Sequence, residues 1–222
     1  MRIGAGPALH VRRAAGRTRG VVLMLPGGKA ESRAAARAWH LSAVRLRFFA
    51  ARVHRAERRN GIAVWSLRYR LRGWNGAEAS PVADARWALN RSRVEHGDVP
   101  VVLIGHSMGG RTALRVADDP AVCAVLGLAP WLPAGEPRPA LGPRPLLVVH
   151  GTDDRWTDPV ASRAYVVAAA AAGTPAVWVP IPDVGHFMLR ARHRWRRVIL
   201  DFVAGLDCLH GQADPVVAPN PD

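Results

Sequence analysis

Residues 105–109 read Gly-His-Ser-Met-Gly, and they follow the apolar run 101–104 and precede a helical pattern. A serine with a glycine two positions away on each side is typical of a nucleophile elbow, the tight strand-to-helix turn that holds a reactive hydroxyl clear of a sheet edge. Side chains larger than glycine at positions 105 and 109 would crowd such a turn. The free N–H groups of the following helix favour a developing negative charge. The pattern therefore predicts that Ser107 is a nucleophile.

A serine hydroxyl needs a base to take its proton, and the usual base is a histidine that a carboxylate orients. In open α/β sheets the reacting groups gather where the strands end. Asp153 and Asp154 follow the apolar run 146–149, and His186 follows the run 176–179. The order along the chain is then serine, acid, histidine, and the residues alone leave either aspartate as the acid.

This order and its surrounding motifs resemble the α/β-hydrolase superfamily, in which serine, acid and histidine follow one another in the same sequence. The resemblance covers roughly residues 18–206 and rests on Leu-Pro-Gly-Gly at 25–28, the elbow at 105–109, Gly-Thr-Asp-Asp at 151–154 and Gly-His-Phe at 185–187. It implies Asp154 as the acid, because the family's acid usually lies three residues after the glycine that ends its strand. Asp153 is the alternative, and Asp158 is better explained as a helix cap.

The resemblance also implies an oxyanion hole, which needs two backbone N–H groups aimed at one oxygen. It assigns one donor to Met108, the residue after the nucleophile. Many relatives carry His-Gly in the loop that supplies the other donor, whereas this chain has Pro-Gly-Gly at 26–28. Aligning Pro26 with that histidine makes Gly28 the second donor, with Lys29 next in line. The implied chemistry is acyl transfer to water, without a cofactor.

Eight tryptophans raise the question of what surrounds the site. Trp131 follows a strand end, Trp156 lies in the acid loop and Trp74 follows the strand predicted at 62–67, so we expect all three on the active-site side, lining a substrate pocket. The tryptophans in predicted helices or strands are expected in the core, namely Trp39, Trp65, Trp87, Trp178 and Trp195. Two histidines beside the motifs, His106 and His150, are interpreted as packed structural residues.

Short apolar runs alternate with helical patterns along the whole chain, which predicts parallel βαβ units. The runs are 21–25, 62–67, 101–104, 125–128, 146–149 and 176–179, and helices are expected at 33–59, 84–94, after Ser107, at 159–172 and at 193–206. Continuous apolar runs are typical of strands that are covered on both faces. We therefore predict an α/β fold with a doubly wound, mostly parallel sheet of six or more strands flanked by helices.

We expect residues 1–209 to form a single domain, with a possible edge hairpin within 1–20, and residues 210–222 to form a disordered tail. Only residues 129–144 separate two predicted strands at the point where many relatives insert a helical lid. This segment is too short for a lid domain and is rich in proline, so we expect an open, shallow site.

The formal net charge is +14, and Lys29 is the only lysine. The arginines are scattered, as a GC-rich genome would produce, so we expect no nucleic-acid partner. No run reaches the ~20 apolar residues that a membrane span requires, and we expect no secretory signal because no continuous apolar core follows the first arginines. With only Cys123 and Cys208, no disulfide framework is expected, and Cys123 is interpreted as a small buried hydrophobe in a cytoplasmic protein.

Together these features predict a serine hydrolase that cleaves a small soluble ester or thioester, resembling a carboxylesterase. A peptidase or a lactone hydrolase is the alternative within the fold, and a non-catalytic binding protein is the alternative outside catalysis. The remaining histidines show no metal-ligand spacing, so no metal site is expected. The sequence leaves the oligomeric state open.

Overall fold

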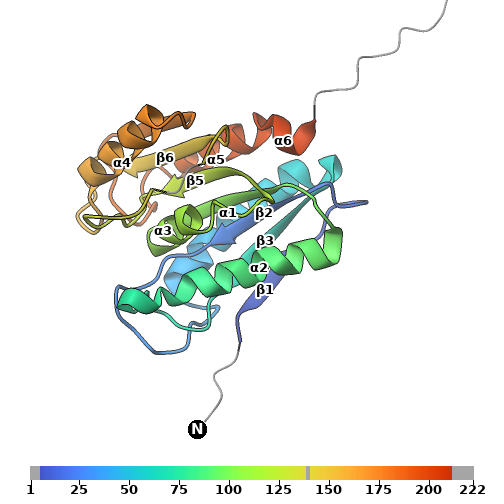
Figure 1. Cartoon of the computed structure of the whole chain (residues 1–222), viewed down its shortest axis with the longest axis horizontal. Coiled ribbons are helices and arrows are strands. Elements are labelled where there is room, and N and C mark those ends of the chain that lie inside the picture. Colours follow the sequence, from blue (N-terminus) through green and yellow to red (C-terminus); the bar gives the residue numbers. More distant parts are fainter. Residues whose placement is uncertain (1–5, 139–140, 212–222) are drawn as a thin grey trace, which may run out of the picture.

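Seven strands form one sheet in the computed structural model, which describes residues 6–138 and 141–211 (Figure 1). The strands are Ala8–Arg12 (β1), Gly20–Leu25 (β2), Ile62–Arg68 (β3), Val101–His106 (β4), Val122–Leu128 (β5), Leu146–Gly151 (β6) and Ala176–Ile181 (β7). Their order is β1-β3-β2-β4-β5-β6-β7, and every neighbouring pair except β1–β3 is parallel. The predicted fold class is thus confirmed.

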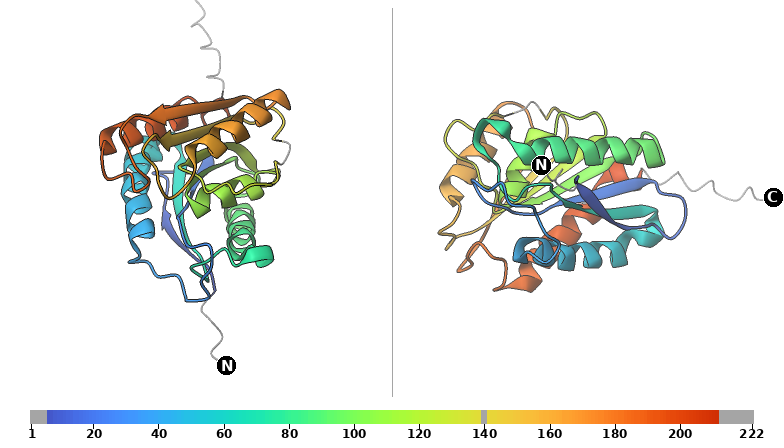
Figure 2. Two further views of the ribbon diagram at one scale, coloured as in Figure 1. Left: turned by 90° about the vertical axis from the view of Figure 1, so that its left-hand side faces the viewer. Right: turned by 90° about the horizontal axis from the view of Figure 1, so that it is seen from below.

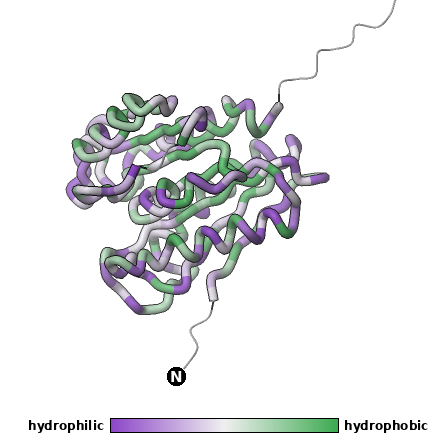
Figure 3. Tube along the Cα trace, viewed as in Figure 1, coloured by the Kyte–Doolittle hydropathy of each residue, from purple (hydrophilic) through white to green (hydrophobic). Residues whose placement is uncertain are grey.

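Helices cover both faces of this sheet (Figure 2). One face packs against Leu41–Glu57 (α1), Arg192–Ala204 (α5) and Asp207–His210 (α6), and the other against Ser80–His96 (α2), Met108–Arg115 (α3) and Pro159–Ala171 (α4). Burial from both sides explains why all residues of β2 and β4 are buried. The hydrophobic colour in Figure 3 accordingly runs along the central strands, while the helices alternate in colour.

The edge strand β1 differs from the hairpin expected within residues 1–20. It pairs antiparallel with β3, placing Leu9 opposite Leu67, and makes no ladder with β2. β2 instead lies between β3 and β4. Residues 1–5 lie outside the described part of the chain. The expectation was wrong because strand partners depend on packing between distant segments, which a local pattern does not report.

The first long helix begins later than expected, since α1 starts at Leu41 and not near residue 33. The segment before it is pinned as an extended loop against the residues that follow β3. Ala35 forms an isolated bridge with Leu71, and the Ala36 N–H donates to the Arg70 carbonyl at 3.1 Å. These pairings satisfy backbone groups that a helix would otherwise satisfy internally.

The tryptophans expected in the core divide into two groups. Trp65 and Trp195 are fully buried, as expected, and Trp178 is partly buried. Trp39 is not in a helix, and 71% of it is exposed to solvent. Trp87 lies on the outer side of α2 and is 36% exposed. The core assignment was therefore wrong for both. Trp39 precedes the start of α1, and for Trp87 a helical pattern does not reveal which side of the helix faces the sheet.

The two cysteines are joined in a disulfide, which corrects the expectation that the chain forms none. Cys123 lies in β5 and Cys208 in α6, and 85 residues separate them. Cys123 is thus a partner in a covalent link and not simply a small apolar side chain. Two isolated cysteines this far apart carry no spacing signal, so only the fold shows that they meet.

The predicted tail falls mostly outside the described residues, which end at residue 211. His210 belongs to α6, so the tail cannot begin at residue 210 as expected. Residues 212–222 lie beyond the described part. Between β5 and β6, the described residues 129–138 and 141–145 contain no helix, as expected.

Candidate active site

Ser107 occupies the turn between β4 and α3 with a backbone conformation that L-residues rarely adopt. Its φ is 56° and its ψ is −121°. A Cβ atom at Gly105 would collide with the Gly109 carbonyl, and one at Gly109 would collide with the Leu25 carbonyl. The crowding anticipated from the sequence is therefore real, and both glycines are needed for the turn to close over the end of β2.

The backbone of the elbow is tied to the end of the neighbouring strand. The Ser107 N–H donates to the Leu128 carbonyl at 3.0 Å, and the Ser107 carbonyl accepts from the Trp131 N–H at 3.1 Å. The same carbonyl accepts from the Gly110 N–H in the first turn of α3. These bonds hold the strained serine in place, as strain persists only where the surroundings fix it.

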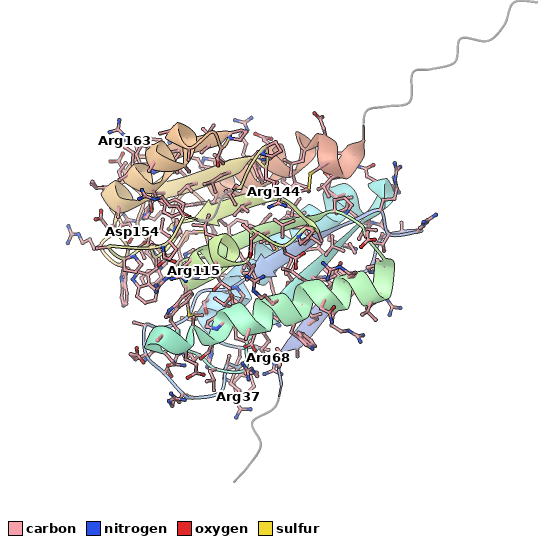
Figure 4. The ribbon with its side chains drawn as sticks, in the orientation of Figure 1. Arg37, Arg68, Arg115, Arg144, Asp154 and Arg163 are labelled. Carbon is pink, nitrogen blue, oxygen red and sulfur yellow. A yellow bond between two sulfur atoms is a disulfide. The ribbon has the colours of Figure 1, made fainter. Side chains whose placement is uncertain are left out.

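Asp154 and His186 meet at the carboxyl ends of β6 and β7. His186 Nδ1 lies 2.8 Å from Asp154 Oδ2, and both residues are buried. Figure 4 shows Asp154 at the end of the molecule where the parallel strands end. Asp153 is exposed, and its carboxylate accepts from the Thr152 hydroxyl. The structure thus brings Asp154 to the histidine and leaves Asp153 outside, while Asp158 caps α4 by accepting from a backbone N–H.

Both carboxylate oxygens of Asp154 are saturated with hydrogen bonds. Oδ1 accepts from the N–H groups of Trp156 at 2.8 Å and Thr157 at 2.9 Å. Oδ2 faces His186, His150 at 3.1 Å and the Thr157 hydroxyl at 2.9 Å. Burial alone would raise the pKa of Asp154, but hydrogen bonds from His150, His186, Thr157 and Trp156 outweigh it and hold the pKa well below its usual range. Asp154 is therefore ionised at neutral pH.

His106 is a packed neighbour of His186, as expected. Its Nε2 lies 3.0 Å from the His186 carbonyl, and the two ring centroids are 4.8 Å apart. Complete burial, reinforced by the nearby His186, lowers the pKa of His106 to about 3. A neutral ring therefore donates Nε2–H to the His186 backbone and fixes that loop beside the elbow.

Ser107 follows His106 directly in the chain, so the contact between His106 and His186 places the serine and the histidine at the same edge of the sheet. Within the described part of the chain, the Ser107 hydroxyl forms no hydrogen bond with His186. In the absence of substrate such bonds are often long or poorly aligned, and they tighten in the bound complex.

The loop that follows β2 lies against the elbow. A Cβ atom at Gly28 would overlap the Met108 side chain and the Arg72 carbonyl, so Gly28 and Met108 are neighbours. The Lys29 N–H donates to the Arg72 carbonyl at 2.9 Å and is no longer available to a ligand. Across residues 6–138 and 141–211, the N–H groups of Gly28 and Met108 have no hydrogen-bond partner. The geometry thus leaves the amides of Gly28 and Met108 free for an oxygen atom.

Two of the three tryptophans assigned to a pocket line the same hollow beside the site. Trp131 and Trp156 border a depression of about 510 Å³ together with the segment 132–136 and the start of α4. The Trp156 ring stacks 6.5 Å from His186 and is 73% exposed. Trp74 does not line this hollow, because it is buried edge-on behind Trp131 at 6.2 Å.

A buried arginine supports these aromatic rings, and it was missed in the sequence. The guanidinium of Arg111 lies 3.8 Å from the Trp74 ring centroid and 4.6 Å from that of Trp131. Its Nε donates to Glu136 at 2.6 Å. The signal that could have found it is the spacing, since Arg111 lies four residues after Ser107 and hence on the same side of α3. Thr157 was missed as well, and only the fold shows its hydroxyl between Asp154 and His186.

Among the described residues, no group of three or more His, Cys, Asp or Glu side chains could hold a metal ion. Within the same part of the chain, no helix combines the length and the apolar character that crossing a membrane requires.

Comparisons with solved structures show the same architecture in hydrolases. The chain is similar to an esterase from Thermogutta terrifontis with propionate bound, at 17% identity and a TM-score of 0.69 over 96% of this chain and 94% of that one. A serine hydrolase without lid from Xanthomonas campestris is 19% identical, with a TM-score of 0.64 over 89% and 88%. A serine hydrolase homologue from Coxiella burnetii is 17% identical, with a TM-score of 0.65 over 89% and 91%. At these identities the likeness shows the fold alone.

Sequence comparison adds the family. No curated protein matches the chain. A model of the alpha/beta hydrolase family matches residues 22–146, a segment that contains the loop after β2, the elbow and the start of β6. The chain therefore belongs to the alpha/beta hydrolase family.

Proposed function

We propose that this protein is a serine hydrolase that cleaves a small soluble carboxylic ester or thioester through an acyl-enzyme. The observation that carries the proposal is the buried 2.8 Å contact between Asp154 and His186, at the edge where the strained Ser107 lies. Supporting it are the amides of Gly28 and Met108, two residues in contact through the Met108 side chain, which have no hydrogen-bond partners among the described residues. A nucleophile, an oriented base and two free donors are the parts that acyl transfer requires.

In the proposed mechanism Ser107 Oγ attacks the substrate carbonyl carbon while His186 Nε2 accepts the hydroxyl proton. The imidazolium that forms is stabilised by the Asp154 carboxylate, which stays ionised. The negative charge on the substrate oxygen is bound by the N–H groups of Met108 and Gly28. As the carbon–oxygen bond breaks, His186 returns the proton to the leaving alcohol. A water molecule then repeats the sequence on the acyl-enzyme and releases the acid and Ser107.

The choice of a small substrate rests on the surroundings of the site. The described residues between β5 and β6 contain no helix that could close over Ser107, and the hollow between Trp131 and Trp156 is open. Two of the similar structures are named as an esterase with propionate bound and a hydrolase without lid. A short-chain ester, as for a carboxylesterase, fits this open and shallow arrangement better than a long lipid.

The deciding experiment is labelling with a fluorophosphonate, which reacts only with an activated serine. We expect covalent capture of the folded protein, and none in the Ser107→Ala variant. Hydrolysis of p-nitrophenyl esters of increasing acyl length should be fastest for short chains and fall to background in His186→Ala. A folded wild-type protein that neither labels nor hydrolyses any ester would instead indicate a non-catalytic binding protein.

A further inference from the structure

A second histidine lies within hydrogen-bond distance of the candidate acid. His150 lies in β6, one residue before the strand ends, and is completely buried. Its Nε2 lies 3.1 Å from Asp154 Oδ2, and its Nδ1 lies 3.0 Å from the Ser162 hydroxyl on α4. Oδ2 therefore has two imidazole nitrogens within hydrogen-bond distance, which is more than packing at a strand end requires.

The two partners of His150 determine which of its nitrogens carries the proton. Asp154 Oδ2 is a carboxylate oxygen and can only accept, so a hydrogen on Nε2 must point towards it. The Ser162 hydroxyl has no other hydrogen-bond partner among the described residues and can donate to Nδ1. The Thr157 hydroxyl also lies 3.2 Å from Nε2, but the charged oxygen is the stronger acceptor.

We propose that His150, held by Ser162, is a positioning residue that fixes the Asp154 carboxylate for His186. This proposal rests on the serine hydrolase function proposed above. Backbone N–H groups hold Oδ1, and the mobile partners of Oδ2 are the Thr157 hydroxyl and the His186 ring. His150 adds to Oδ2 a donor that a buried strand holds rigidly, which keeps this oxygen in place for His186 Nδ1. The order of contacts runs from Ser162 through His150 and Asp154 to His186, and ends at the elbow.

The second donor also tunes the strength of the contact between Asp154 and His186. Negative charge on Oδ2 is shared between two N–H groups, so each receives less of it. Removing His150 would leave a more basic carboxylate that binds the His186 imidazolium more tightly. The acid limb of the pH–rate profile would then move to higher pH. If His150 had only a structural role, its removal would change the stability of the protein or the maximal rate, and the acid limb of the pH–rate profile would stay at the same pH.

Three variants and one matched control test the proposal. His150→Leu removes both hydrogen bonds at similar volume, whereas His150→Gln can keep an N–H donor near Oδ2. Ser162→Ala removes the proton that fixes the tautomer of His150. Ser92→Ala is the control, because Ser92 is a similarly buried helical serine whose hydroxyl has no hydrogen-bond partner in the described part of the chain. Each protein is compared by circular dichroism and thermal unfolding before kinetics are measured on a p-nitrophenyl ester.

For folded His150→Leu we expect kcat to fall by about tenfold to a hundredfold, with KM nearly unchanged. Losses of this size are typical when the hydrogen-bond partner of a metal-binding histidine is removed, and His150 supports Asp154 in the same way. Its acid limb should move to higher pH. His150→Gln should recover most of kcat and the wild-type limb, Ser162→Ala should show a smaller loss of the same kind, and Ser92→Ala should match wild type.

The outcomes separate this inference from the function on which it rests. An active wild type with an equally active, folded His150→Leu would overturn the positioning role and leave the hydrolase function standing. A loss of kcat without any movement of the acid limb, or without rescue by glutamine, would also overturn it. A wild type that fails to label with fluorophosphonate would overturn the function and the inference together.

Discussion

The two halves of the candidate site differ in how completely their polar groups are satisfied. Around Asp154 every carboxylate lone pair is engaged by strand, loop or histidine donors. Around Gly28 and Met108 the backbone amides have no partner among the described residues. Met108 is buried, and a buried donor is rarely left unpaired without reason, whereas Gly28 is exposed to solvent.

This contrast assigns a separate task to each half. The hydrogen bonds around Asp154 are already formed without substrate, so in the proposed mechanism no free energy is needed to reorganise them during the reaction. In the proposed mechanism the amide half is completed only by an oxygen of the substrate, and that oxygen becomes most negative in the transition state. In this proposal the rigid hydrogen-bonded groups surround the permanent charge of Asp154, and the unpaired amides lie where negative charge develops during the reaction. The following changes, from the largest expected effect to the smallest, test this division.

Asp154→Asn should have the largest effect, because it disrupts the hydrogen bonds that hold Asp154 and His186 together. The amide cannot accept from every donor around it and favours the wrong tautomer of His186, so kcat should fall by roughly ten-thousandfold, as for the equivalent change in other triads. Asp153→Asn is the matched control and should keep full activity, since Asp153 is exposed and its carboxylate forms no hydrogen bond with His186 among the described residues. Esterase kinetics that reversed these two results would assign the acid to Asp153.

Gly28→Ala should lower kcat by about a hundredfold, the cost of losing one oxyanion donor. The new Cβ would collide with Met108 and the Arg72 carbonyl and push the amide away from its place. Gly16→Ala is the control, because a Cβ there meets nothing within 4 Å. KM should change little in either variant. Wild-type kcat in Gly28→Ala would show that another amide serves the oxyanion.

Trp156→Ala tests the predicted substrate pocket, because the Trp156 indole stacks near His186 and lines the hollow. We expect KM for short esters to rise severalfold with a smaller change in kcat, since the ring offers apolar surface and not chemistry. Trp39→Ala removes an equally exposed indole that does not line the hollow, and its kinetics should match wild type. Equal effects of both substitutions would contradict a pocket role for Trp156.

The disulfide lies outside both halves and should affect activity least. The double variant Cys123→Ala/Cys208→Ala should keep wild-type kcat and KM at 25 °C. Its free energy of unfolding should fall by about 4 kcal/mol, because the link closes a loop of 85 residues. Urea titration of the two proteins measures the difference. A loss of activity at unchanged stability would show that β5 transmits the link to the site.

The sequence predicted well those parts whose cause is local. The central strands were found because sheets covered on both faces need continuous apolar runs, and the elbow was found because the crowding at Gly105 and Gly109 arises within a few residues. Local sequence evidence was weaker where two adjacent residues could fill the same role. The choice between Asp153 and Asp154 depended on a family pattern, and the structure resolves their placement through donors from other elements, such as His186.

The remaining differences come from pairings between distant segments. β1 pairs with β3 because that edge of the sheet is free, which its own five residues cannot indicate. The Ala- and Arg-rich residues before Leu41 have a helical composition but are held as a loop by Arg70 and Leu71. Tertiary contacts override helix propensity in such cases because propensity is worth less than one kcal/mol per residue, a weak preference. The meeting of Cys123 and Cys208 has the same long-range origin.

The short connection between β5 and β6 also bears on the timing of turnover. In many enzymes a lid must open in each cycle, and that motion limits kcat. The described residues of 129–145 contain no helix that could act as such a lid, so for the proposed mechanism we expect neither product release nor the approach of water to wait for a motion of this segment. Turnover should then proceed at the pace of bond making and breaking. Bulk water should also reach the acyl-enzyme readily, so that hydrolysis prevails over transfer of the acyl group to another alcohol.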